Sequence, residues 1–324
     1  MTAYALRRTL MMIPMMLGIT LISFFIISAA PGDPTEIATD LNPNVSAEAV
    51  QKIRALYHLD EPWYVQYWLW LKRVAVLDFG DSFSPDGRPV MEKINERLPV
   101  TLFINIVALA MNMLLAIPIG VIAATRPYGW FDKVTTLFVF LGVSAPTFWV
   151  ALLLMILFGV HLGWLPISGL VAYNHDQLSL MGQMVDYARH LALPVLISGL
   201  TGLAFLSRLT RQNTLETLRA DYIVTARAKG LPESTVLFKH SLRNALLPLV
   251  TTMGLTLPSL IGGSVIFESI FAIPGLGQLF YQGVMMRDYP LIMASLVIIS
   301  FLTLVGNLLA DLAYAYVDPR ISYE

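Results

Sequence analysis

Long uncharged stretches constrain this chain more than any other feature. A helix that crosses the hydrocarbon core of a bilayer needs about 20 predominantly apolar residues. Charged residues make up only 13% of the 324 residues, whereas soluble globular proteins carry about 25%. The sequence therefore predicts an integral membrane protein. Its seven stretches of 18 or more residues without Asp, Glu, Lys or Arg are 9–32, 98–125, 134–175, 190–207, 244–267, 269–286 and 289–310.

Composition also excludes several classes of protein. With 56% hydrophobic residues, the chain is not intrinsically disordered. Its net charge of -1 argues against nucleic-acid binding through overall charge. The absence of cysteine excludes disulfides, thiolate metal sites and a cysteine nucleophile. The histidines show no metal-ligand spacing and are interpreted as structural; they are His58, His161, His175, His190 and His240.

The stretches are interpreted as six membrane-spanning helices in an all-α fold. The stretch 134–175 is too long for one helix, and its glycine- and proline-containing second half is expected to form a loop. The stretch 269–286 contains Pro274, Gly275 and Gly277, and irregular backbone is not stable facing lipid. It is therefore expected to be an external loop or a re-entrant segment. The predicted spans are 9–30, 101–125, 135–160, 190–209, 246–267 and 291–315.

Basic residues predict the orientation of these spans. Arg7 and Arg8 precede the first span, and basic residues near span ends favour the cytoplasmic side. The loop 207–245 carries seven more and falls on the same side, so both termini are expected in the cytoplasm. The predicted organisation comprises an N-terminus with the first span (1–30), an extracytoplasmic insertion (31–100), a five-helix core with its cytoplasmic loop (101–315) and a cytoplasmic tail (316–324).

The insertion is acidic and contains a dense run of aromatic residues over 57–70. Tyrosine and tryptophan favour the boundary between membrane and water. This run is interpreted as an interfacial helix that packs on the bundle. The alternative is a docking surface for an external partner.

Local signals in the cytoplasmic loop predict two short helices joined by a sharp turn. Asp221 is suited to cap a helix that begins near Tyr222. Arg227 and Lys229 fall in its last turn, where the helix dipole favours positive charge, and Gly230 follows in a position suited to left-handed geometry. Pro232 and Glu233 then begin a second helix.

The first of these helices is expected to expose an apolar side, formed by Ile223, Ala226 and Leu231. This side either lies back on the bundle or inserts into another protein.

Several short blocks of this sequence resemble blocks of a known protein family. Residues 225–231 (Thr-Ala-Arg-Ala-Lys-Gly-Leu) and 242–248 (Leu-Arg-Asn-Ala-Leu-Leu-Pro) resemble the cytoplasmic signature of ABC importer permeases of the dipeptide, oligopeptide and nickel branch. The chain is most similar to the B-type subunits. The wider signature begins Glu-Ala-Ala, where this chain has Val224-Thr225-Ala226. Further matching blocks, in the order of the family, are 6–8, 30–34, 78–82, 274–280, 287–290 and 318–320.

The resemblance implies a type I importer permease in a prokaryotic cytoplasmic membrane. Its partners would be a second, C-type permease, two ATPase subunits and an extracytoplasmic solute-binding protein that delivers peptides. ATP and magnesium would bind the ATPases, so this chain would be non-catalytic and hold no cofactor. The short helix would be the coupling helix, whose contact residues are Asp221, Ile223, Thr225, Ala226, Arg227, Ala228, Lys229, Gly230 and Leu231.

The residues themselves also indicate which mechanisms are open to this chain. No lysine follows a glycine, so the Gly-x4-Gly-Lys-Ser/Thr phosphate loop is missing and another chain must bind any ATP. An ion-coupled secondary transporter is the alternative function, although Glu268, Asp288 and Asp311 fall at predicted helix ends. Polar residues that are candidates for lining a pathway are Asn105, Asn112, Ser144, Thr147, Thr256, Ser259, Ser264 and Asn307, although such groups more often join helices.

Overall fold

The computed structural model describes residues 2–29, 60–256, 260 and 263–317, together with residues 48, 51, 54, 55 and 58. These residues form helices and loops, and within them the only β pairing is an isolated bridge between Asp81 and Pro89. The longer helices are α1 (Thr2–Ser28), α4 (Trp63–Ala75), α5 (Val90–Thr125), α6 (Trp130–Ser144), α8 (Leu180–Leu218) and α15 (Tyr289–Val317).

Shorter helices connect these elements. They are α7 (Thr147–Leu154), the π-helix η1 (Met155–His161), the 3-10 helix η2 (His175–Gln177), α9 (Asp221–Ala228), α10 (Glu233–Thr235), the π-helix η3 (Val236–Ser241), α11 (Leu242–Ala245), α12 (Leu247–Thr256), α13 (Val265–Ile270) and α14 (Leu276–Met285).

Three described helices, in α1, α5 and α15, are long and apolar enough to cross a membrane by themselves. The number rises to five if α6 with α7 and η1, and the two halves of the bent α8, each count as one span. These five positions agree with five of the predicted spans. The remaining prediction, 246–267, begins in α12, which ends at Thr256, and residues 257–259, 261 and 262 lie outside the described residues. The count of six spans stays a prediction.

Two helices begin well before their predicted starts. α5 begins at Val90 and α8 at Leu180, so the segment 90–100 is part of a core helix as well as of the predicted insertion. A search for uncharged runs misses these turns because they carry charged residues such as Lys93 and Asp186. Polar partners outside these two helices stabilise the side chains. Asp186 Oδ2 accepts from the Ala172 amide at 2.9 Å and lies 2.7 Å from His175 Nδ1. Lys93 contacts Ser82 and Asp86.

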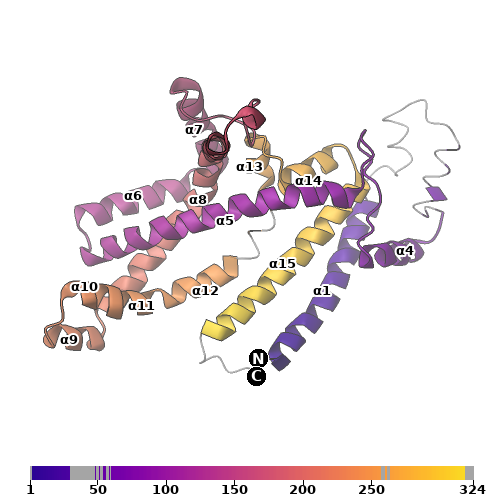
Figure 1. Cartoon of the computed structure of the whole chain (residues 1–324). Helices are drawn as coiled ribbons and strands as arrows, with labels where there is room; N and C mark the ends of the chain where they lie inside the picture. The colour runs from indigo at the N-terminus through magenta and orange to yellow at the C-terminus, as the bar shows by residue number, and fades with distance from the viewer. Residues whose placement is uncertain are drawn as a thin grey trace.

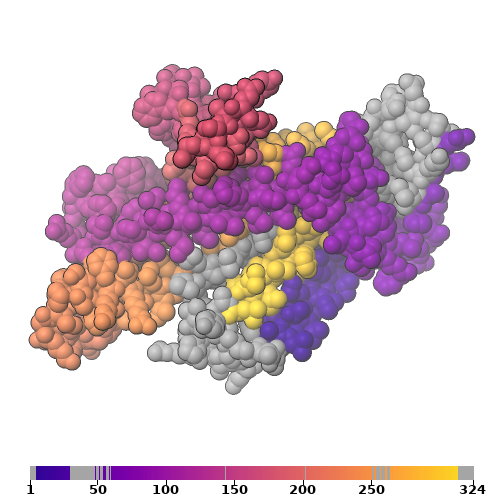
Figure 2. All heavy atoms as spheres, viewed as in Figure 1, coloured from indigo at the N-terminus to yellow at the C-terminus, as the bar shows by residue number. Residues whose placement is uncertain are grey.

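The helices form two packed groups (Figure 1). α5 and α8 lie against each other, with α6 packed on both, while α1 pairs with α15. An ion pair between Arg8 Nη1 and Asp311 Oδ2 at 3.1 Å joins the start of α1 to the end of α15. The segment around α9–α11 protrudes at one end of the molecule, and α4 lies near the other (Figures 1 and 2). We call these the α9 end and the α4 end.

α4 packs on α1 through its aromatic residues, which confirms the prediction of a helix that lies on the bundle. The rings of Phe24 and Tyr67 meet edge to face at 5.5 Å between centroids. The Tyr67 hydroxyl also lies 3.0 Å from the Thr20 hydroxyl. The alternative interpretation, a docking surface, stays a prediction for the exposed rings of Trp63, Tyr64 and Trp68.

A buried polar network fastens the segment after α4 to the start of α15. The Lys93 ammonium donates to Ser82 Oγ at 3.0 Å and to Asp86 Oδ1 at 2.6 Å. This contact with Lys93 is the main reason why the pKa of Asp86 falls to about 2. Ser82 also donates to the fully buried carboxylate of Asp288, which accepts from the Leu291 amide at 3.2 Å. Ser82 and Asp288, which are 206 positions apart, are thus held together by a charge-assisted hydrogen bond.

The stretch 269–286 does not form a span, as expected from its glycines and Pro274. It forms the hairpin of α13 and α14, which a buried carboxylate fastens to α5. Glu268 Oε1 accepts from the Thr101 hydroxyl at 2.9 Å, and Oε2 accepts from the Gln278 amide at 2.9 Å. Thr101 Oγ1 in turn accepts from the Leu276 amide at 2.8 Å. One threonine hydroxyl therefore satisfies two buried groups of the hairpin.

We expect Thr101→Val to destabilise this hairpin by about 2–4 kcal/mol. The variant has nearly the same shape, but it leaves the Leu276 amide and one oxygen of Glu268 without a partner, and each buried unsatisfied group costs about 1–3 kcal/mol. Thr101→Ser keeps the hydroxyl and is the matched control. Thermal unfolding of the purified protein compares the two variants. Equal midpoints would show that water or another group replaces the threonine hydroxyl.

Candidate functional site

The protruding segment contains a short helix, α9, which ends at a turn formed by Gly230. α9 runs from Asp221 to Ala228, and its N-cap is Ala220. The expectation that Asp221 caps the helix is wrong, since it occupies the first helical position without a capping hydrogen bond. It still lies in the first turn, where the helix dipole favours a negative charge. Gly230 has φ of +75° and donates its amide to Arg227 O at 2.9 Å, which confirms the left-handed turn.

The inward face of α9 is a small apolar core. Ile223 is 0% exposed and contacts Ala226 and Val236 in a buried cluster separate from the rest of the bundle. The expectation that Ile223 and Ala226 are exposed is therefore wrong, because η3 folds back beneath α9 and covers them. Leu231 is exposed, as expected. Ile223 and Ala226 thus support the helix rather than offer a surface.

Polar contacts stiffen the turn around Gly230. Arg227 forms a bidentate pair with Glu233 across it, with Nε–Oε2 and Nη2–Oε1 distances of 3.1 and 2.5 Å. Asn244 Nδ2 donates to the Tyr222 hydroxyl at 3.0 Å, which ties α9 to α11. A hydroxyl contact of 2.7 Å between Thr217 and Ser241 joins η3 to α8. α9 is therefore held by its neighbours at both ends.

The Arg227–Glu233 pair should make this turn sensitive to acid. The hydrogen bond from Arg227 lowers the pKa of Glu233. Because the pKa of Glu233 is lower in the folded than in the unfolded protein, the pair stabilises the fold at pH values above the unfolded pKa of about 4.3. This stabilisation is lost as the pH falls through the folded pKa. Glu233→Gln should raise hydrogen exchange at amides 226–231 near pH 6, and the difference from wild type should vanish on acidification. Glu216→Gln, whose glutamate has no ion pair within the described part of the chain, is the control.

The outward face of α9 carries the exposed residues of the predicted contact set. Asp221, Thr225, Arg227, Ala228 and Lys229 are exposed, as is the glycine of the turn. Two further exposed residues were not in that set: Tyr222, and Val224, which is 58% exposed. The α9 surface, as we use the term, consists of Tyr222, Val224, Thr225, Ala228 and Leu231 together with the flanking Asp221 and Lys229.

The candidate pathway residues are spread over several elements. Ser144 ends α6, Thr147 begins α7, Thr256 ends α12, and Asn307 lies exposed on α15. Ser264 caps α13 by accepting from the Phe267 amide at 3.3 Å. Ser259 lies outside the described residues. A role for these residues in lining a pathway stays a prediction.

Two of the candidates lie at contacts between segments of the bundle, and one of them forms a hydrogen bond there. Asn105 Nδ2 donates to Leu260 O at 2.6 Å, which links α5 to the segment after α12. Asn112 is buried where α5 meets α8, and its side chain fills the space left by Gly199 and Gly202. Its Oδ1 has no hydrogen-bond partner among the described residues. Side-chain amides often link membrane helices by hydrogen bonds, as Asn105 does.

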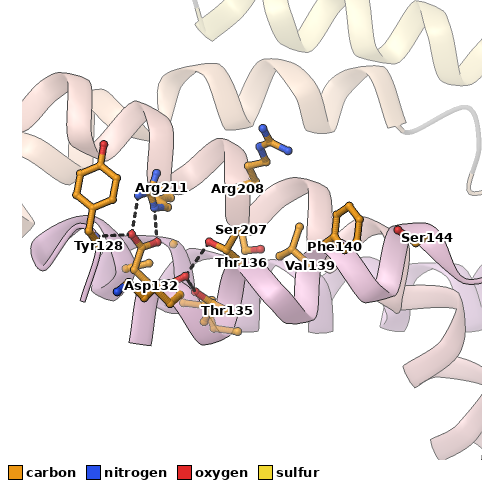
Figure 3. Close-up of a pocket in the computed structure, with 14 residues that line it drawn as sticks. Tyr128, Asp132, Thr135, Thr136, Val139, Phe140, Ser144, Ser207, Arg208 and Arg211 are labelled. Carbon is orange, nitrogen blue, oxygen red and sulfur yellow. Dashed lines mark hydrogen bonds and ion pairs between the residues drawn. The ribbon is translucent and has the colours of Figure 1, made fainter. Parts of the chain in front are cut away.

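The structure also contains a site that the sequence did not reveal. Asp132 of α6 accepts two hydrogen bonds from Arg211 of α8, at 2.5 and 2.6 Å, and one from the Tyr128 amide at 2.7 Å (Figure 3). The pair borders a cavity of about 580 Å3 between α5, α6 and α8. Residues 132 and 211 are 79 positions apart, and no local pattern connects them.

Comparison with known proteins assigns the bundle to a family. Residues 116–323 match the family described as "Binding-protein-dependent transport system inner membrane component", and residues 1–105 match its N-terminal family. The chain belongs to this family. It is therefore a transport permease and an integral membrane protein, as the sequence predicts.

Relatives of this permease match over the full length of both chains. It is 47% identical to the oligopeptide transport system permease protein AppB of Bacillus subtilis. It is 36% identical to the dipeptide transport system permease protein DppB of Alkalihalophilus pseudofirmus. A putative peptide transport system permease protein of Brucella suis is 40% identical. The family resemblance read from the sequence blocks is confirmed, and an ion-coupled carrier is disfavoured.

Proposed function

We propose that this permease is one of two membrane subunits of an ATP-driven importer of di- and oligopeptides. The observation that carries the substrate class is its 47% identity, over the whole of both chains, to an oligopeptide permease. The partners in the proposal are a second permease, two ATPase subunits and an extracytoplasmic binding protein. ATP and magnesium belong to the ATPases, so the permease itself performs no chemistry.

The basic residues support an orientation in which the α9 end faces the cytoplasm. Arg126 and Lys133 flank the α5–α6 turn, and Arg219, Lys229 and Lys239 surround α9. An excess of Lys and Arg in short loops near the span ends is typical of the cytoplasmic side. In this orientation both termini are cytoplasmic, and α4 lies on the extracytoplasmic face.

The α9 surface is the proposed seat of the ATPase contact. A coupling element must be stiff, because a flexible loop absorbs the motion that it should transmit. α9 meets this need through its buried core, the Arg227–Glu233 pair and the Asn244 contact. It also presents exposed apolar side chains at Val224 and Leu231, which a protein partner seated on the protruding segment would bury.

Single-cysteine variants test the contact and the orientation together, since the chain has no cysteine of its own. In membrane vesicles that contain both permease subunits, prepared with and without the ATPase subunits, we expect Val224→Cys to react with a membrane-impermeant maleimide from the cytoplasmic side. The reaction should slow at least several-fold when the ATPase subunits are present. Ile223→Cys is the matched control, because the adjacent side chain is buried and should react slowly in both states.

Tyr173→Cys reports the other side of the membrane. Tyr173 is fully exposed in the loop before η2 and should react only from outside. Labelling of Val224→Cys from outside would overturn the orientation. Labelling of Val224→Cys that is indifferent to the ATPases would overturn the coupling role of α9. ATP-dependent uptake of labelled di- and oligopeptides in proteoliposomes of the complete transporter then tests the substrate class.

A further inference from the structure

The cavity between α5, α6 and α8 carries a positive charge that the described residues of the permease do not neutralise. Three basic side chains and one acidic side chain line it, namely Lys133, Arg208, Arg211 and Asp132. Asp132 is occupied by its bidentate pair with Arg211. Within the part of the chain that the structure describes, neither Lys133 nor Arg208 has an acidic partner. Both are exposed, so the cavity offers two available cations.

The cations lie at one end of the cavity, and the lining beyond them is mostly apolar. α6 and α8 run antiparallel there, because Asp132 in the first turn of α6 meets Arg211 near the end of α8. Arg208 is three residues earlier on α8, which places it about 4.5 Å further along the helix axis. Beyond it the lining from α6 consists of Val139 and Phe140, with Ser144 at the end of the helix (Figure 3). A ligand that fits both ends has an anionic head and an apolar body.

The surroundings place the cationic end at the level of lipid headgroups. Tyr128, whose amide binds Asp132, and Trp130 at the start of α6 are 77% and 79% exposed, and such aromatic side chains gather at membrane interfaces. The next turns of α6 expose Leu137, Phe138 and Leu141, which suit a hydrocarbon environment. In the proposed orientation this is the cytoplasmic leaflet, whose anionic lipids attract basic groups.

We propose that this cavity binds the headgroup of an anionic phospholipid through Lys133, Arg208 and the Tyr128 hydroxyl, with an acyl chain along Val139 and Phe140. This inference rests on the orientation given with the proposed function. The hydroxyls of Thr135, Thr136 and Ser207 already donate to backbone carbonyls. Ser144 lies at the other end of the cavity (Figure 3), so the two cations and Tyr128 supply the donors at the cationic end. A zwitterionic peptide fits less well, because its ammonium group would meet Lys133 and Arg208 without an available acid.

Native mass spectrometry and thermal unfolding of the purified transporter test whether the cavity binds an anionic phospholipid. The probes are phosphatidylglycerol and phosphatidylcholine with identical acyl chains, glycerol phosphate as a headgroup without chains, and dialanine. We expect phosphatidylglycerol to be retained and to raise the unfolding midpoint more than phosphatidylcholine does. The double variant Lys133→Gln with Arg208→Gln should bind phosphatidylglycerol roughly 30-fold more weakly, since each cation near an anionic surface contributes about fivefold.

Two further double variants complete the experiment. Lys133→Arg with Arg208→Lys keeps both charges and should keep the lipid. Arg219→Gln with Lys239→Gln removes two exposed basic residues elsewhere at the α9 end, and should leave phosphatidylglycerol binding unchanged. Equal weakening in the latter variant would overturn the site in favour of general surface charge.

Other outcomes would show that the cavity binds a free phosphate or a peptide rather than a lipid. Stabilisation by glycerol phosphate that equals the effect of the whole lipid would overturn the role of the apolar wall. Displacement of the lipid by dialanine, or a raised KM for peptide uptake with unchanged lipid retention, would assign the cavity to the transport route. Failure of the orientation is detected separately by the cysteine labelling above.

Discussion

Gly230→Val should abolish most ATP-driven uptake while leaving the bundle folded. Gly230 has φ of +75°, and nothing lies within 4 Å of a Cβ added there. The expected cost therefore comes from the backbone, at about 1–2 kcal/mol for a non-glycine residue in left-handed geometry. That cost shifts the equilibrium between the ordered and disordered turn by about 5- to 30-fold. α9 then loses the stop that positions its exposed face against a partner.

Gly230→Asn is the matched control, because asparagine tolerates left-handed geometry far better than a β-branched residue. Uptake and ATP hydrolysis are measured together on the assembled transporter in proteoliposomes. We expect the valine variant to hydrolyse ATP with little uptake, or to lose ATPase subunits during purification, and the asparagine variant to retain most of both. Wild-type uptake in Gly230→Val would remove α9 from the coupling pathway.

This turn was predictable from sequence because its determinants are local. A glycine after basic residues, followed by proline and glutamate, indicates a helix end and a new helix within a few positions. The approximate positions of the spans in α1, α5 and α15 were also predictable, since a long uncharged run has few alternatives to a membrane helix. Both inferences depend on neighbours in the chain.

The contacts that the sequence did not reveal are long-range. The burial of Ile223 depends on Val236 folding back from η3, and the pairing of Asp132 with Arg211 depends on how α6 meets α8. The early start of α5 at Val90 depends on Lys93 finding Ser82 and Asp86 outside the helix. A search for uncharged runs ends a span at the first charged residue, such as Lys93. The helix continues past this residue because polar partners outside the helix bind its side chain.

The packing of α5 on α8 determines the position of both candidate sites, because α8 carries Arg211 and leads directly into α9. Small residues let the two backbones approach closely, as is usual between membrane helices. Ala116, Ala123 and Ala124 of α5 are almost completely buried. At Gly120 the approach is closest, and an added Cβ would lie 2.6 Å from Ser207 O and 2.9 Å from Arg211 N.

Even Gly120→Ala should therefore destabilise the bundle severely. The added methyl group meets the backbone of α8, which moves only if the two helices separate, and overpacking of this kind costs about 1–3 kcal/mol or more. Separation would also pull Arg211 from Asp132, so the cost of a broken, partly buried ion pair adds to it. Gly18→Ala is the matched control, since Gly18 lies within the membrane helix α1 with nothing within 4 Å of its added Cβ. Thermal unfolding in detergent should show a large fall in midpoint for Gly120→Ala and little change for Gly18→Ala. Equal unfolding midpoints for the two variants would show that α5 and α8 lie further apart at Gly120 than the distances to Ser207 O and Arg211 N indicate.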